Sequence, residues 1–209
     1  MLDSSKSHFK LEHVISFGDA IFAFSITIVL LSIQVPQIPN PTESDIVKAI
    51  WNLRTPFESY AISFAVIGIY WVLYHKVFNR IIDTHPLITG FNLVFLFFIT
   101  LISLFTILNI NYGSFHIVFI LYTIILASTG FVLTIIWVIA IKTKSIHGEM
   151  NPSLVKLFLW NSITPPVIFT VSIAVSYISI DVAQYFWVLI VPCRLIISKR
   201  YKTKSHSLV

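Results

Sequence analysis

Charged residues are scarce in this sequence. Only 11% of its 209 residues are charged, whereas 56% are hydrophobic and the mean hydropathy is +0.87. Ordinary globular domains carry roughly 25% charged residues, so this composition excludes an ordinary soluble domain. Backbone amides in lipid must bond within helices or a closed barrel, and the long apolar runs lack a barrel's alternation. We therefore expect an all-α integral membrane protein built as a helix bundle.

Cysteine is almost absent, and so are the motifs of enzymes and metal sites. Cys193 is the single cysteine, which excludes an intrachain disulfide. No cysteine and histidine cluster has the spacing of a zinc or haem site, and no nucleophile motif accompanies the histidines. The N-terminus lacks the short apolar core and cleavage site of a signal peptide. We therefore expect no enzymatic activity and no cofactor, and the first hydrophobic segment is interpreted as a membrane span.

Six hydrophobic segments are long enough to be membrane spans at 1.5 Å per residue. They lie at about residues 14–35, 57–78, 87–109, 115–141, 154–179 and 182–198. Pro165 and Pro166 predict a kink in the fifth span. The sixth span is the shortest, because Pro192 and Arg194 interrupt its apolar run. We expect residues 1–209 to form one domain of six transmembrane helices. A short helix is also predicted from residue 44 to 53, before span two.

Lysine and arginine are distributed unevenly between the two sides of these spans. Lys48 and Arg54 lie on one side. The other side carries the remaining twelve of the fourteen: Lys6, Lys10, Lys76, Arg80, Lys142, Lys144, Lys156, Arg194, Lys199, Arg200, Lys202 and Lys204. The positive-inside rule then predicts that both termini are cytoplasmic. The net charge of +5 is explained by orientation and by contact with anionic lipid rather than by nucleic-acid binding.

The first span carries one carboxylate in an otherwise apolar stretch. Asp19 is the only charged residue between positions 14 and 35. An unpaired carboxylate in lipid costs at least about 2.5–3.5 kcal/mol, so we expect Asp19 to face the protein interior, a partner or a water-filled path. Trp71, His75 and Asn92 lie on the same side of the membrane. A hydrogen-bonded network of these four side chains would hold the acid, although an interfacial tryptophan and a solvated histidine are the alternative.

Two stripes follow the first span at helical spacing. One combines large apolar residues with a neighbouring threonine: Phe17, Phe24, Ile28, Leu31 and Thr27. If several copies of this helix surrounded an axis, the apolar residues would form stacked rings that block hydrated ions by dewetting. Ordinary packing or a lipid-facing surface is the alternative explanation. The second stripe consists of small residues, which predict close helix packing: Gly18, Ser25 and Ser32.

These residues resemble the transmembrane protein 175 family of potassium channels, whose bacterial members are also known as domain of unknown function 1211. The family's first helix carries an arginine, three residues, Phe-Ser-Asp, an alanine and an Ile/Leu/Thr-rich run. The matching residues here are His13, Phe17, Gly18, Asp19, Ala20 and Thr27. In spans two and three Trp71, His75 and Asn92 fit the family. His13 replaces the family arginine and Gly18 its serine. If that arginine neutralises the aspartate, His13 does so only when protonated.

The resemblance implies a homotetramer in which four copies of span one surround a potassium-permeable pore. The Thr-Val-Gly-Tyr-Gly filter of ordinary potassium channels is missing from the family and from this sequence. Carried over by position, Phe24, Ile28 and Leu31 form the constriction, and Thr27 contributes to cation preference. The other matched residues form a structural polar network: His13, Phe17, Asp19, Trp71, His75 and Asn92. The implied partners are potassium, other monovalent cations and membrane lipid, and the implied location is a prokaryotic plasma membrane.

Two further functions fit the residues. A proton-coupled transporter of small solutes would use Asp19 and His75 as its relay. Cation flux that is insensitive to a proton gradient separates a channel from this transporter. A membrane-embedded enzyme or a helper subunit without a pore is the other possibility; the missing motifs argue against the enzyme, and an electrically silent purified protein would favour the helper.

Overall fold

The structure is a computed structural model that describes residues 11–83, 85–146 and 151–206, with side chains as far as Tyr201. The described elements are α1 (Leu11–Leu31), α2 (Glu43–Asn52), α3 (Arg54–Phe78), α4 (Pro86–Tyr112), α5 (His116–Lys142), α6 (Pro152–Ser176), α7 (Ile180–Tyr185), the 3-10 helix η1 (Phe186–Leu189) and α8 (Ile190–His206). Within these ranges, six helical stretches are long and apolar enough to cross a membrane. The prediction of an all-α bundle with six membrane helices is confirmed.

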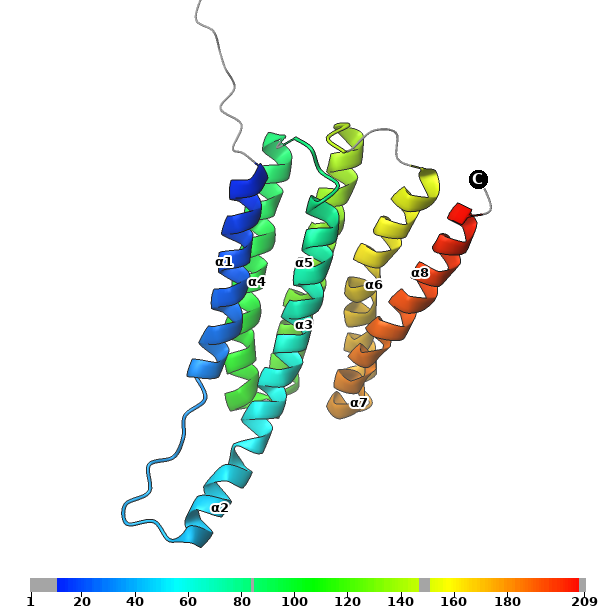
Figure 1. The fold of residues 1–209 in the computed structure, drawn as a ribbon. Helices are drawn as coiled ribbons and strands as arrows, with labels where there is room; N and C mark the ends of the chain where they lie inside the picture. Colours follow the sequence, from blue (N-terminus) through cyan, green and yellow to red (C-terminus); the bar gives the residue numbers. More distant parts are fainter. Residues whose placement is uncertain (1–10, 84, 147–150, 207–209) are drawn as a thin grey trace, which may run out of the picture.

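The helices run side by side, and α1 lies at one edge of the bundle (Figure 1). α1 and α4 both begin at the end where α3 and α8 finish, so α1 and α4 are parallel to each other. α1 packs against α3 and α4, while α6 packs against α5 and α8 on the far side. Much of the surface of α1 is therefore left uncovered by the protomer.

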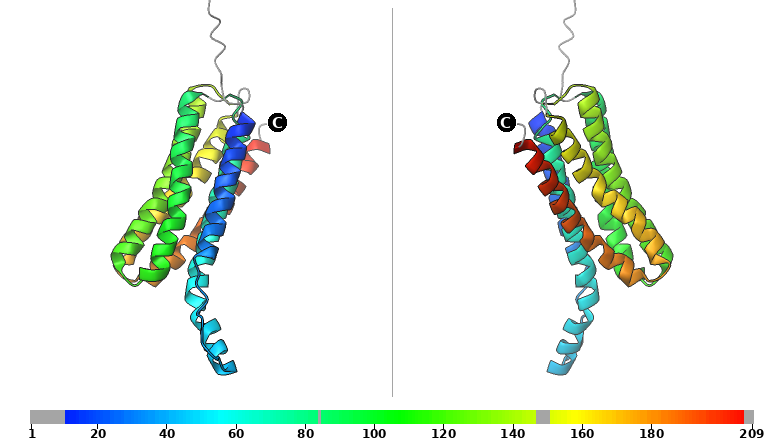
Figure 2. Two further views of the ribbon diagram at one scale, coloured as in Figure 1. Left: turned by 90° about the vertical axis from the view of Figure 1, so that its left-hand side faces the viewer. Right: turned by 90° about the vertical axis from the view of Figure 1, so that its right-hand side faces the viewer.

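The segment between the first two membrane helices differs from the prediction at both ends. α1 stops at Leu31, four residues before the predicted limit, and α3 starts at Arg54, three residues before the predicted start of span two at residue 57. The predicted short helix is present as α2, whose first turn is capped by Thr42 and Asp45. α2 and α3 form one nearly continuous rod, and α2 projects past the ends of the neighbouring helices (Figures 1 and 2).

The two prolines of the fifth span lie inside one helix. α6 is one helix from Pro152 to Ser176 and continues through Pro165 and Pro166. α5 has a glycine where the Pro166 ring approaches it, since a Cβ at Gly130 would lie 2.6 Å from Pro166 Cδ. The proline pair is thus accommodated by close packing of α5 on α6.

A cluster of aromatic rings joins four helices in the core. Phe22 of α1 lies 5.6 Å from the Tyr74 ring of α3 and 6.0 Å from the Phe95 ring of α4. Tyr74 and Phe95 are stacked at 5.6 Å with an interplanar angle of 2°. Tyr70 of α3 adds an edge contact to Phe95 and a tilted contact to Phe169 of α6. The inner side of α1 is therefore anchored to the centre of the bundle.

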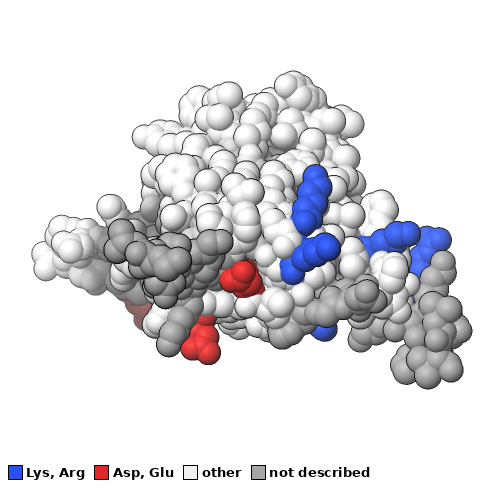
Figure 3. Space-filling view, turned by 90° about the horizontal axis from the view of Figure 1, so that it is seen from above, with Lys and Arg blue, Asp and Glu red and all other residues white. Residues whose placement is uncertain are grey.

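Most of the described lysine and arginine side chains belong to one end of the bundle. They are Lys76, Arg80, Lys142, Lys144, Lys156, Lys199 and Arg200, at helix ends and connections, and Figure 3 shows lysines and arginines on this end face. Lys48 and Arg54 belong to the opposite end, in α2 and at the start of α3. Lys6 and Lys10 lie outside the described residues, and of Lys202 and Lys204 only the helical backbone is described.

Candidate functional site: the first helix and its polar contacts

One face of α1 is buried against the bundle. It is formed by Val14, Gly18, Phe22, Ser25 and Val29. Ser103 of α4 donates a hydrogen bond of 2.8 Å from its Oγ to the backbone oxygen of Ser25. Two of the three small residues that the sequence singled out therefore lie at a helix contact, as close packing requires. The third, Ser32, follows the end of α1 and is half-buried.

At Gly18, α1 approaches α3 closely. A Cβ at this position would lie 2.6 Å from the hydroxyl of Tyr74 and 2.9 Å from its Cζ. The Tyr74 hydroxyl donates in turn to the backbone oxygen of Val14 at 3.3 Å. The glycine that replaces the family's serine thus has a local cause, since the tyrosine fills the space that a serine side chain would need.

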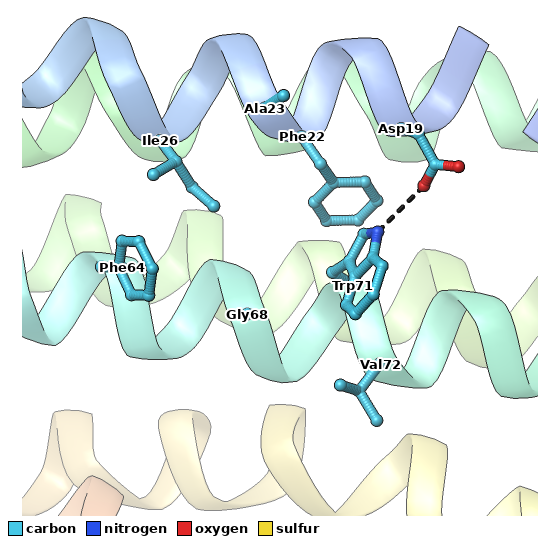
Figure 4. A pocket seen from close by; sticks show the side chains of 8 residues that line it. All are labelled: Asp19, Phe22, Ala23, Ile26, Phe64, Gly68, Trp71 and Val72. Atoms are coloured by element: carbon cyan, nitrogen blue, oxygen red, sulfur yellow. Dashed lines mark hydrogen bonds between the residues drawn. The ribbon is translucent and has the colours of Figure 1, made fainter. Parts of the chain in front are cut away.

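Asp19 is held by two side chains of α3 (Figure 4 shows the tryptophan contact). Trp71 Nε1 donates to Asp19 Oδ1 at 2.9 Å, and His75 Nε2 lies 2.7 Å from the same oxygen. The two rings meet edge to face with centroids 4.7 Å apart. The Asp19 side chain remains 43% exposed and that of His75 26% exposed. The carboxylate is thus paired within the protomer, but its cluster lies at the protomer's surface.

Asn92 is the predicted network member that the structure places elsewhere. It is 1% exposed, and its side chain lies beside the Tyr74 hydroxyl rather than on the carboxylate of Asp19. Its Oδ1 has no hydrogen-bond partner among the described residues. Of the four predicted side chains, the structure brings together Asp19, Trp71 and His75, and Tyr74 separates Asn92 from them.

His13 and Phe17 also lie apart from the carboxylate. Both are exposed and line an open pocket of about 300 Å³ between α1 and α4, together with Thr89, Asn92 and Leu93. The described hydrogen bonds of Asp19 come from α3. His13 therefore does not take the place of an arginine paired with Asp19 in this structure.

The predicted constriction residues are uncovered in the protomer. Phe24 is 60% exposed, Ile28 36% and Leu31 82%. Phe17, in the same stripe, is 52% exposed. Thr27 is exposed as well, and its hydroxyl donates within the helix to the backbone oxygens of Ala23 and Phe24. The stripe thus faces away from its own bundle, toward either lipid or another copy.

An open apolar groove lies between α1 and α3 beside Asp19. Its volume is about 410 Å³, and it is lined by Asp19, Phe22, Ala23 and Ile26 of α1 and by Phe64, Gly68, Trp71 and Val72 of α3. Gly68 lies between Phe64 and Trp71 along the α3 side (Figure 4). A Cβ at Gly68 would meet no atom within 4 Å. The groove therefore has a free notch at its middle and a carboxylate at one end.

Sequence reasoning missed Tyr74 and Gly68. Tyr74 follows the pattern of a core residue, four positions before Phe78, and its role at Gly18 depends on the exact approach of two helices. The sequence does not indicate Gly68, because a glycine in an apolar span has neither charge nor size to distinguish it. The replacement of the family's serine by Gly18 was the available signal that a bulky neighbour lies there.

The described residues contain no group of three or more histidine, cysteine, aspartate or glutamate side chains that could hold a metal ion. Among the described residues of this site, Asp19 and His75 are the only acidic and basic side chains that contact each other. These contacts provide hydrogen bonding and charge pairing around one carboxylate.

Comparison with known proteins gives results for sequence and for fold. The family model described as endosomal/lysosomal potassium channel TMEM175 matches residues 13–102. A potassium channel of Streptomyces collinus is 33% identical over 81 residues, and a potassium channel of Chamaesiphon minutus is 29% identical over 97 residues. The resemblance to the transmembrane protein 175 family is confirmed.

The two relatives match this chain over less than half of its length. The matches cover 39% and 46% of this chain and only 38% and 48% of the two relatives' lengths. The crystal structure of a lysosomal potassium-selective channel TMEM175 homolog from Chamaesiphon minutus matches 90% of this chain and 97% of that chain, with a TM-score of 0.76 and 22% identity. The family match thus covers most of α1 and α4 and all of α3, and the shared fold extends over 90% of the chain.

Proposed function

We propose that this protein is a potassium-permeable cation channel whose pore is lined by α1. The channel is a homotetramer, and Phe24, Ile28 and Leu31 of the four copies form apolar constriction rings with Thr27 between them. It conducts without a Thr-Val-Gly-Tyr-Gly filter. The observation that carries this proposal is the uncovered apolar face of α1, within the segment that matches the potassium-channel family.

The physical argument for a pore rests on the two faces of α1. Its inner face is fixed by the Ser25 contact and by the aromatic cluster around Phe22. Its outer face carries large apolar side chains at helical spacing, and Leu31 is 82% exposed. Four such faces around an axis produce stacked apolar constriction rings, which exclude water and block hydrated ions until the rings widen.

The polar cluster has a different role in this proposal. Asp19 is bonded to Trp71 and His75 of α3, so it fixes the rotation and height of α1 relative to the bundle. The rotation matters because neighbouring residues are about 100° apart around a helix, so a turn of α1 by that angle would replace each constriction side chain by its neighbour. Asp19, Trp71 and His75 therefore position the pore helix, and they do not line its narrow part.

The orientation follows from the charged ends. The end that carries Lys76, Arg80, Lys142 and the other basic side chains is the cytoplasmic one, and α1 starts and α8 finishes at this end. α2 then projects on the outer side. The membrane is the plasma membrane of a prokaryote, because both sequence relatives come from bacteria. Residues 1–209 act as one six-helix channel domain.

Ion flux from liposomes tests the proposed function. Purified protein is reconstituted in potassium-loaded liposomes, and the wild type is compared with Phe24→Ala and Leu31→Ala. Both variants shorten a side chain in a proposed ring, so we expect faster potassium flux. Val167→Ala is the matched control, because Val167 is a 46% exposed residue of α6, remote from α1.

Two outcomes contradict the proposal. Unchanged flux in both α1 variants would show that these rings do not limit conduction. Flux that requires an imposed proton gradient would favour a proton-coupled transporter, in which the Asp19 and His75 pair serves as the relay.

A further inference from the structure

The groove between α1 and α3 is unsuited to lipid because of Asp19. This carboxylate is eight residues from the start of α1, about 12 Å along the helix, and its side chain is 43% exposed. A carboxylate facing acyl chains is costly even when it is partly paired. The rest of the groove is apolar, so water alone does not suit it either. A protein surface that is apolar and closes over the carboxylate fits both properties.

The same protomer offers such a surface on α4. Large side chains recur there at helical spacing and are exposed: Leu93 at 54%, Phe97 at 59% and Leu104 at 56%. The groove is on the side of α1 that faces α3, whereas the pocket lined by Phe17 and Leu93 is on the side that faces α4. The groove and the α4 surface thus flank the exposed stripe of α1 on its two sides.

The two flanks also agree in depth. Ser103 of α4 bonds to Ser25 of α1, an offset of 78 residues between two parallel helices. Applied to the groove, this offset puts Phe97 level with Asp19, and Leu104 level with Ile26. Rotation about an axis along the membrane normal changes no residue's depth, so the next copy in a ring presents these residues at the same levels.

From this geometry we infer that α4 of a neighbouring copy docks in the groove between α1 and α3. Phe97 of that copy covers the Asp19 and Trp71 end, and its Leu104 covers the Phe64 end. The notch at Gly68 lets the incoming helix approach closely. The contact is heterologous, because groove and α4 are different surfaces, and repetition closes a ring with the α1 stripe inside. This inference rests on the proposed tetrameric channel and assigns its subunit interface.

Disulfide cross-linking at matched depths tests the interface. Cys193 is changed to serine, which leaves no native cysteine. Two double variants place cysteines at equal depth on the two flanks, Val72→Cys with Phe97→Cys and Phe64→Cys with Leu104→Cys. After oxidation we expect ladders of dimer, trimer and tetramer, because every copy carries both partners.

The controls use the same four cysteines in the crossed combinations. Val72→Cys with Leu104→Cys, and Phe64→Cys with Phe97→Cys, are mismatched by about 10 Å in depth, beyond the reach of a disulfide. We expect no ladder from them or from the four single variants. Equal ladders from matched and crossed pairs would overturn the inference, and so would dimers from a single variant, which indicate a two-fold contact.

Filling the notch gives an independent measurement. Gly68→Phe adds a ring where the protomer has free space, so the helical content is expected to stay the same while the tetramer dissociates. Ala174→Phe on the exposed side of α6 is the matched control and is expected to keep the tetramer. A normal Gly68→Phe tetramer in light scattering would contradict the docking.

Potassium flux from the parent Cys193→Ser protein separates this inference from the proposed function. Flux without matched ladders would refute the interface and leave the channel standing. Matched ladders in a protein that carries no potassium would support the interface and refute the channel.

Discussion

Asp19 shows how a single polar residue organises the edge of a membrane bundle. It is the one acid within the apolar part of α1, and the nearest donors of α3, Trp71 and His75, both reach its Oδ1. Sequence predicted this meeting because few polar residues lie at that depth, and each of them needs a partner. The sequence did not predict that the Asn92 side chain would lie beside the Tyr74 hydroxyl, because a tyrosine in an apolar span has several possible neighbours.

We expect Asp19→Asn to weaken assembly and leave ion preference unchanged. The amide keeps an acceptor for Trp71 and loses the charge that strengthens both bonds, a loss of about 1–2 kcal/mol. Thermal unfolding in detergent and tetramer yield measure the first effect, and the ratio of potassium to sodium permeability measures the second. Glu12→Gln, an exposed acid at the start of α1, is the control. Normal tetramer yield with altered selectivity would contradict a positioning role.

The contact at Gly18 makes a second prediction at this scale. Gly18→Ala drives a methyl group to 2.6 Å from the Tyr74 hydroxyl, so α1 and α3 must separate, at a cost of about 1–3 kcal/mol. The measurement is the thermal midpoint compared with Gly90→Ala, whose added Cβ meets nothing within 4 Å. That control is expected to be neutral or stabilising by about 0.5–1 kcal/mol. Equal midpoints for the two variants would show that α1 packs less closely on α3 than described.

The number of membrane helices is predictable from composition and hydropathy. Low charge and long apolar runs predicted six membrane helices, because lipid leaves the backbone few alternatives. The limits of the helices were less predictable. α1 stops at Leu31 and α3 starts at Arg54, since helix ends depend on local caps and turns rather than on hydropathy. The groove beside Gly68 was not predictable, because it results from the relative placement of two helices.

Three helices of the core are joined by buried hydroxyl groups. Ser63 of α3 lies 2.8 Å from the Tyr122 hydroxyl of α5, and Thr106 of α4 donates to Ser63 at 2.8 Å. The hydroxyl groups of Ser63 and Thr106 also lie within hydrogen-bond distance of backbone oxygens of their own helices, so the single proton of each is shared between alternative acceptors. The three side chains are almost completely buried. Hydrogen bonds between membrane helices contribute about 0.6 kcal/mol each on average, so this group adds modestly to packing.

Removal of the tyrosine hydroxyl measures that contribution. We expect Tyr122→Phe to lower the free energy of unfolding by about 0.5–1.5 kcal/mol, because Ser63 and Thr106 keep their own backbone acceptors. Tyr112→Phe, at the exposed end of α4, is expected to change it by less. The comparison is made by denaturant titration in detergent. A loss of several kcal/mol would mean that the hydroxyl group holds the core together far more strongly than its two hydrogen bonds, to Ser63 and Thr106, would provide.

At the scale of the whole molecule, the protomer is asymmetric. Its core joins α3, α4 and α6 through aromatic contacts, while α1 adds one face to that core and leaves the other uncovered. A helix with Leu31 82% exposed is ordinary against lipid but also suits an axis shared by several copies. The partly exposed Asp19 cluster favours the second arrangement, because lipid accepts apolar side chains and rejects a carboxylate.

The most direct test of a pore along α1 is block of potassium flux by a charged thiol reagent. In a Cys193→Ser background, Phe24→Cys and Leu31→Cys are compared with Phe131→Cys, a 39% exposed residue of α5. The account predicts that a water-soluble methanethiosulfonate reagent, added during liposome flux, blocks both α1 variants and leaves the α5 variant conducting. Undiminished flux through both α1 variants after the reagent would contradict it.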